Sequence, residues 1–163
     1  MFFKTINEIS ERYNEAMNGK GRSKQMPGNV YFLDDHRILS IPDRSTDCRY
    51  PYGYDGFNFW AHSSGYMYCN DGRFSVFPKA SEGQEPKIAF FAGFRHSDDD
   101  HEVISLLPVP RLRTLNMTAV RYTVFSGSCA YYITEACDMR FSVRVFPDKE
   151  NTLHFTLGAE NLS

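Results

Sequence analysis

The residues of this chain best suited to chemistry are aromatic side chains interleaved with short polar ones between positions 50 and 68. Flat apolar rings cover the C–H face of a sugar, and short polar side chains bond its hydroxyls. The pattern therefore indicates a carbohydrate-contacting surface. Packing in a core or a subunit contact is the alternative, because aromatic residues favour strands whatever the function. The candidates for a carbohydrate or interface role are Asn58, Trp60, His62, Tyr66 and Tyr68.

A second group, His-Ser-Asp-Asp-Asp-His-Glu at positions 96–102, has the carboxylates and imidazoles that bind divalent ions. It lacks the glycine and the regular carboxylate spacing of a calcium loop. Like charges gathered between strands are typical of a solvated loop. We therefore predict no metal site.

No catalytic group is evident. The aspartates that could form an acid and base pair all lie in turn-like sequence, where Asp bonds the backbone. They are Asp34, Asp35, Asp43, Asp47 and Asp55. Ser63 and Ser64 have no nucleophile-elbow context. We therefore predict that no catalytic residue lies in this chain.

Most of the chain after residue 29 shows the period-two pattern of β-strands. The last four strands are expected at 119–125, 130–136, 140–146 and 153–162, and earlier ones at 29–33, 37–41, 57–62, 66–69, 73–77 and 88–95. Asp71-Gly72 is a tight hairpin signal. Helix at one end and many short strands afterwards predict a mainly β fold, an antiparallel β-sandwich with a short N-terminal helix.

Alternation within the strand at 57–62 places three apolar residues on one face and Asn58, Trp60 and His62 on the other. Because Trp60, His62 and Tyr66 surround the Ser63–Gly65 turn, we expect them to face a partner domain or subunit rather than the domain's own core.

The N-terminal segment has helical spacing. Thr5 and Glu8 form a capping box, and a helix is expected from Ile6 to Met17 with Ile6, Ile9, Tyr13 and Met17 on its apolar face. We expect residues 1–28 to be helix and linker and 29–163 to be the sandwich domain. Since the last strand runs to the end of the chain, the sandwich is expected to be truncated at that edge.

Composition excludes several classes of partner. A net charge of −2 with scattered Lys and Arg offers no surface for nucleic acid. No apolar run is long enough for a membrane span, and the charged N-terminus is unlike a signal peptide, which predicts a cytoplasmic protein without membrane contact. The four cysteines match no zinc spacing and are expected to be reduced thiols.

Two stretches covering about two-thirds of the chain resemble a known family. In residues 54–95, a strand leads through Ser63-Ser64-Gly65-Tyr66 into an aromatic strand. In residues 120–163, a strand ends at Phe146-Pro147 and the next ends at Asn161-Leu162-Ser163. Both are similar to the opening β-domain of inverting glycoside phosphorylases of the cellobiose, chitobiose and cellodextrin phosphorylase type.

The resemblance implies a sandwich of the super-sandwich type, placed before a C-terminal helical-barrel catalytic domain. Such enzymes cleave a terminal glycosidic bond of an oligosaccharide with inversion, using inorganic phosphate as co-substrate and no other cofactor. One carboxylic acid, in the barrel, protonates the leaving oxygen. The resemblance also implies a homodimer and a β-domain loop at the edge of the active site. A free-standing carbohydrate-binding module and a structural interaction domain are the alternatives.

Overall fold

The computed structural model of the chain describes residues 2–18, 25–26, 30–34, 36–41, 47–54, 56–70, 75–77, 88–95, 97–108 and 119–163. Within these residues the protein is mainly β, with antiparallel sheets and one N-terminal helix, so this part of the predicted fold is confirmed. The predicted hairpin at Asp71-Gly72 lies outside the described residues.

The described strands form three antiparallel sheets. The largest has the order β1-β2-β3-β10-β11-β12-β13, with bounds Gln25–Met26, Val30–Phe32, Arg37–Ser40, Val120–Ser126, Ala130–Ala136, Met139–Pro147 and Leu153–Asn161. The second has the order β4-β5-β6-β7, with bounds Arg49–Tyr54, Phe57–His62, Met67–Asn70 and Ser75–Phe77. The third pairs β8, Phe91–Arg95, with β9, His101–Ser105.

Strands β10 to β13 form a meander at the predicted places. The β11–β12 connection is the two-residue turn Cys137-Asp138, in which both residues have positive φ, 52° and 55°. This backbone matches the right-handed twist of the flanking strands. The β12–β13 connection spans Asp148 to Thr152 and is closed by a hydrogen bond from the Asp148 amide to the Thr152 carbonyl.

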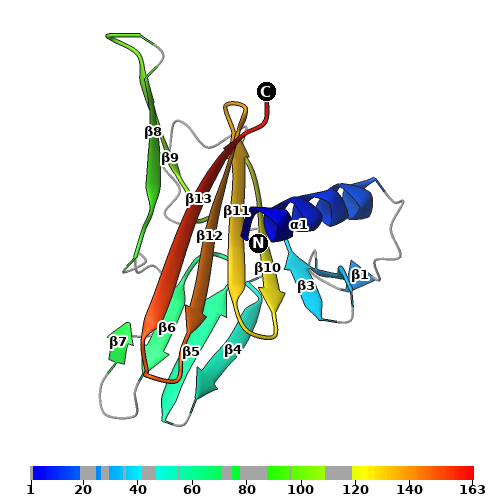
Figure 1. Cartoon of the computed structure of the whole chain (residues 1–163), viewed down its shortest axis with the longest axis vertical. Helices are drawn as coiled ribbons and strands as arrows, with labels where there is room; N and C mark the ends of the chain where they lie inside the picture. Colours follow the sequence, from blue (N-terminus) through cyan, green and yellow to red (C-terminus); the bar gives the residue numbers. More distant parts are fainter. Residues whose placement is uncertain are drawn as a thin grey trace.

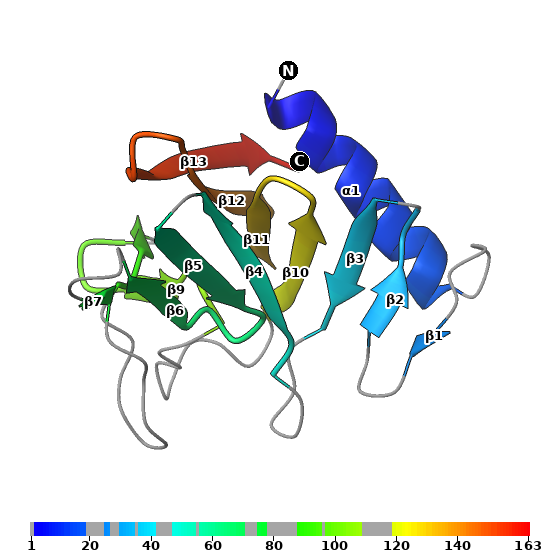
Figure 2. The same ribbon diagram turned by 90° about the horizontal axis from the view of Figure 1, so that it is seen from below.

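The large sheet is covered on both faces, by helix α1 (Phe2–Met17) on one and by β4–β7 on the other (Figures 1 and 2). Tyr122 and Val124 of β10 pack toward the helix, whereas Phe125 packs toward the second sheet. Strands buried on both faces need apolar residues at nearly every position, which explains why β10 and β11 are almost continuously buried. The β8–β9 hairpin lies beside β13, with the Phe90 ring 5.4 Å from that of Phe155 (Figure 1).

Helix α1 begins at Phe2, four residues before the predicted start, so Thr5 lies inside the helix and does not cap it. The reason is tertiary packing on β13. A Cβ atom on Gly158 would lie 2.7 Å from the Phe2 ring, so the glycine leaves the space that this ring occupies. Met17 is 40% exposed and does not belong to the buried face, which Ile6 and Ile9 form.

Three strands fall where none was expected. Strand β4 contains Pro51 and Gly53, which argue against a strand, but β4 lies at the edge of its sheet, where a missing N–H costs no ladder bond. Strand β1 lies in the predicted linker, and β9 begins at His101 inside the predicted acidic loop. In each case pairing with the neighbouring strand in a hairpin outweighs the weak strand signal of the segment itself.

Candidate functional site

The predicted site residues come together on the face of the four-stranded sheet that points away from the large sheet. Along β5, the expected alternation is present: Phe57, Phe59 and Ala61 are buried, Asn58 is exposed and His62 is partly buried. Trp60, between Asn58 and His62, is 38% exposed. A tryptophan this open, in a strand whose other face is fully packed, is available for contact with another molecule.

Neighbouring strands complete the surface around Trp60. Pro51 of β4 and Tyr68 of β6 are its cross-strand partners, and Asn58 pairs with Asn70 in the same way. The Asn70 amide donates a hydrogen bond of 3.0 Å to the Tyr68 hydroxyl. We name this set, Pro51, Asn58, Trp60, Tyr68 and Asn70, the Trp60 face. It combines aromatic rings with two side-chain amides, the combination that sugar recognition requires.

At one end of this face, His62 is held by a residue that sequence reasoning assigned only to a turn. The Nδ1 atom of His62 lies 2.7 Å from Oδ2 of Asp47, and the Ser64 amide donates to Oδ1 at 3.1 Å. The Ser63 hydroxyl donates to the same Oδ1 at 3.4 Å. No local signal marks Asp47, because it reaches His62 only through the pairing of β4 with β5.

The electrostatics of Asp47 decide what it can do. Burial of its carboxyl by itself raises the pKa, but the hydrogen bonds from His62 and Ser64 outweigh burial and hold the pKa below its ordinary value. A general acid for glycoside cleavage needs a raised pKa. Asp47 therefore stays ionised and orients His62, and the surface beside it is suited to binding rather than to proton donation.

The turn from Ser63 to Tyr66 packs against the large sheet instead of projecting from the domain. The Ser63 carbonyl accepts a bond from the Thr123 hydroxyl, and the His62 carbonyl accepts one from the Tyr132 hydroxyl, each at 3.0 Å. Gly65 has φ of +92°, and a Cβ there would lie 3.0 Å from Cβ of Leu107. Tyr66 is half-buried at this turn, so Trp60 is the most open aromatic residue of the predicted group.

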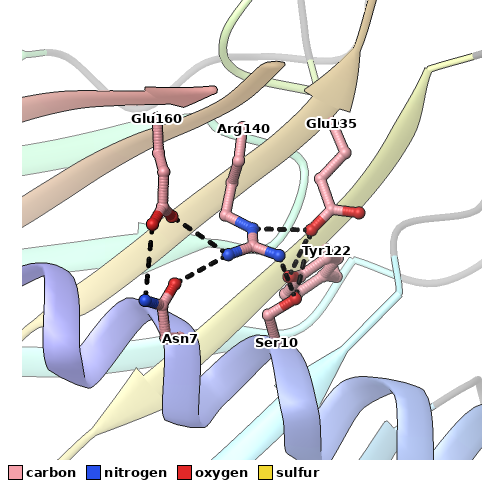
Figure 3. Close-up of polar contacts among 6 residues, drawn as sticks. All are labelled: Asn7, Ser10, Tyr122, Glu135, Arg140 and Glu160. Carbon is pink, nitrogen blue, oxygen red and sulfur yellow. Dashed lines mark hydrogen bonds and ion pairs between the residues drawn. The ribbon is translucent and has the colours of Figure 1, made fainter. Parts of the chain in front are cut away.

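A second polar group lies on the opposite face of the large sheet, between α1 and strands β10 to β13 (Figure 3). The Arg140 guanidinium donates to Glu135 at 2.8 Å and to Glu160 at 3.1 Å. It also donates to Asn7 and Ser10 of the helix, both at 2.8 Å. Tyr122 completes the group by donating its hydroxyl hydrogen to Glu135 at 3.3 Å.

This Arg140 network is structural. All three guanidinium nitrogens have partners, and the Arg140 side chain is 13% exposed. A planar guanidinium with fixed donors suits two carboxylates and two helix side chains at once. Because every guanidinium nitrogen bonds a residue of the helix or the sheet, the network ties α1 to the sheet.

The acidic segment does not assemble a metal site in the part of the chain that is described. Among the described residues, no three His, Cys, Asp or Glu side chains are placed to hold one ion. Asp98, Asp99 and Asp100 are exposed, and Asp98 pairs with Arg95. His96 lies outside the described residues. None of the four cysteines forms a disulfide.

Two further observations bear on function. Within the described residues, no helix combines the length and apolar character needed to cross a lipid bilayer. Comparison of the chain with protein families, with curated proteins and with solved structures finds no match. The features of this chain that point to a function are therefore the Trp60 face and the two stretches, residues 54–95 and 120–163, that resemble glycoside phosphorylases.

Proposed function

We propose that this chain is the N-terminal, non-catalytic domain of a carbohydrate-active enzyme, and that the Trp60 face contacts an oligosaccharide at the edge of the active site. The observation that carries the proposal is the 38% exposure of Trp60 between Pro51 and Tyr68. A sugar ring stacks its C–H face on the indole, while the amides of Asn58 and Asn70 bond hydroxyls at its rim.

The parent enzyme in this proposal is a cytoplasmic inverting glycoside phosphorylase that acts on a β-linked glucan or a related oligosaccharide. The chain is its β-sandwich of the super-sandwich type, it takes part in a homodimer, and a helical barrel supplies the catalytic acid and the phosphate site. Support comes from the two stretches that resemble this family, which in the fold contain β5–β8 and β10–β13. The lowered pKa of Asp47 agrees with a binding role on this face.

Trp60 also provides the test, because it is the only tryptophan of the chain and its fluorescence reports on this surface alone. We expect di- to pentasaccharides of β-linked glucose or N-acetylglucosamine to cause a saturable change in emission of the purified chain. Phe91→Ala, at an exposed aromatic residue of β8, is the control and should leave the titration unchanged. An emission spectrum that no oligosaccharide alters would refute sugar contact at this face.

A protein-interaction role is the second candidate, and one observation favours it. Phe91 and Val103 are 49% and 41% exposed and lie on the same outward face of the β8–β9 hairpin. Apolar side chains exposed together mark contact sites. If this hairpin holds two subunits together, Phe91→Ser combined with Val103→Ser should convert a dimer to a monomer in light scattering without changing the Trp60 emission.

A further inference from the structure

An open hollow of about 910 Å³ surrounds the free end of the β4–β5 hairpin. One wall carries Pro51, Tyr54 and Asn58, and the opposite wall carries Lys149 and Asn151 from the turn between β12 and β13. Because β4 is an edge strand, side chains from both of its faces reach this space. Its volume lies within the range of roughly 300–1,000 Å³ that is usual for small-molecule sites.

The lining has the chemistry of a sugar subsite. Tyr54 is 44% exposed and offers an aromatic surface. Asn58 and Asn151 offer amides that both donate and accept, and Lys149 offers a donor ammonium. Lys149 forms no ion pair with any described residue, so its hydrogens are available to hydroxyl oxygens.

The far wall is held in place before any ligand arrives. The Asp148 carboxylate accepts the amide hydrogens of Glu150 and Thr152 at 2.8 and 3.0 Å, and its other oxygen lies 2.5 Å from Nε2 of His154. Asn151 is in the left-handed region with φ of 59°, which Asn tolerates better than most residues. A turn fixed in this way presents Lys149 and Asn151 at low entropic cost to binding.

The hollow is continuous with the Trp60 face, since Pro51 and Asn58 belong to both. Asn58 and Trp60 are two residues apart on the same face of β5, a separation of about 7 Å along a strand. An extended molecule that stacks on Trp60 therefore reaches the Asn58 side of the hollow directly. It contacts Tyr54 only by passing round the end of the β4–β5 hairpin, because Tyr54 pairs with Phe57 on the other face of the sheet. A single sugar ring cannot fill both places.

We infer that the hollow is a second subsite, which takes further units of the same β-linked oligosaccharide that stacks on Trp60. The inference depends on the proposed sugar contact at the Trp60 face. It adds Tyr54, Lys149 and Asn151 to the binding residues and makes chain length a determinant of affinity. The subsite selects for oligosaccharides over disaccharides.

The test compares a disaccharide with a pentasaccharide of β-linked glucose, and the same pair built from N-acetylglucosamine, by calorimetry and by Trp60 emission. We expect the unmodified chain to bind one pentasaccharide at least about tenfold more tightly than its disaccharide. Tyr54→Ala and Lys149→Met should each remove most of this preference and leave the disaccharide affinity unchanged. Lys4→Met on α1 and Phe91→Ala are the matched controls, because both side chains are exposed and lie outside the hollow.

The outcomes separate the two proposals. If Trp60 responds to sugars but both lengths bind equally well, or if the length preference survives both substitutions, the second subsite is refuted and the Trp60 contact stands. If no sugar alters the emission or releases heat, both proposals fail. Lys149→Met changes an exposed turn residue, so it tests the subsite even if Tyr54→Ala impairs folding.

Discussion

The imidazole Nδ1 of His62 lies 2.7 Å from the carboxylate of Asp47, although 15 residues separate them in the sequence. Arg49 pairs with His62 across β4 and β5, and this register brings Asp47, two residues before Arg49, beside the ring. The same carboxylate accepts the Ser64 amide. One aspartate therefore both orients a residue at the end of the Trp60 face and closes the turn that follows it.

Asp47 should make the stability of the domain sensitive to acid. Because the pKa of its carboxyl in the folded protein lies below the ordinary value of 3.8, the ionised form stabilises the fold above that pH. This contribution is lost as the pH falls through the lower, folded pKa. We expect Asp47→Asn to reduce the free energy of unfolding at pH 7 by about 1–3 kcal/mol and to flatten its decline below pH of about 4.

Urea unfolding measured from pH 7 to pH 3 checks this expectation. Asp99→Asn is the control, since Asp99 is exposed in the acidic segment. Asp34 and Asp148 also have lowered pKa values, so every variant keeps some sensitivity to acid. The informative quantity is therefore the difference in unfolding free energy between variant and parent at each pH. If the free energy of unfolding falls equally steeply with decreasing pH in Asp47→Asn and in the parent, the role assigned to Asp47 is wrong.

Arg140 should be worth far more than an ordinary surface cation. Arg140→Met leaves Glu135 and Glu160 without their shared partner at sites that are 22% and 31% exposed. Removal of one partner from a largely buried pair costs about 3 kcal/mol. Arg12→Met breaks an exposed ion pair with Glu15 within α1, the helix that Arg140 contacts. This substitution should cost about 0.5 kcal/mol or less. Urea denaturation of both variants gives the comparison, and similar losses would show that the network is not a structural tie.

Gly65 should tolerate no side chain. Its φ of +92° is unfavourable for alanine, and the added Cβ would lie 3.0 Å from Leu107 and 3.2 Å from Pro108. We expect Gly65→Ala to lower the free energy of unfolding by about 1–3 kcal/mol. Gly127→Ala has open space around its Cβ and no positive φ in that region, so its effect should be about 0.5 kcal/mol or smaller. Thermal melts of the two variants distinguish conformational strain from a general cost of replacing glycine.

The purified chain should show no phosphate-dependent cleavage of cello- or chito-oligosaccharides. Asp47, the carboxylate beside the Trp60 face, has a lowered pKa and cannot serve as the proton donor that glycosidic cleavage requires. The measurement is the release of sugar 1-phosphate, monitored by chromatography. Turnover that copurifies with the chain and disappears on a single substitution within it would contradict a non-catalytic role.

The strands that could be predicted are those whose pattern is purely local. Strands β5 and β10 to β13 alternate or run apolar over their whole length, and the structure places them within two residues of the expected bounds. The partition of β5 into a buried face and a face with Trp60 follows from the same period of two. Strand β4 could not be predicted in this way, because Pro51 is acceptable only at a sheet edge, and the edge is a property of the assembled sheet.

The sequence by itself determined the mainly β class, the N-terminal helix and the outward position of Trp60, because backbone propensity and side-chain alternation act between near neighbours. Only the tertiary structure decided the start of α1 against Gly158, the partnership of Asp47 with His62, and the enclosure of Arg140 by helix and sheet. These contacts join segments from 15 to more than 130 residues apart. Such contacts depend on which strands pair and how the layers pack, and neither is encoded in the local spacing of residues.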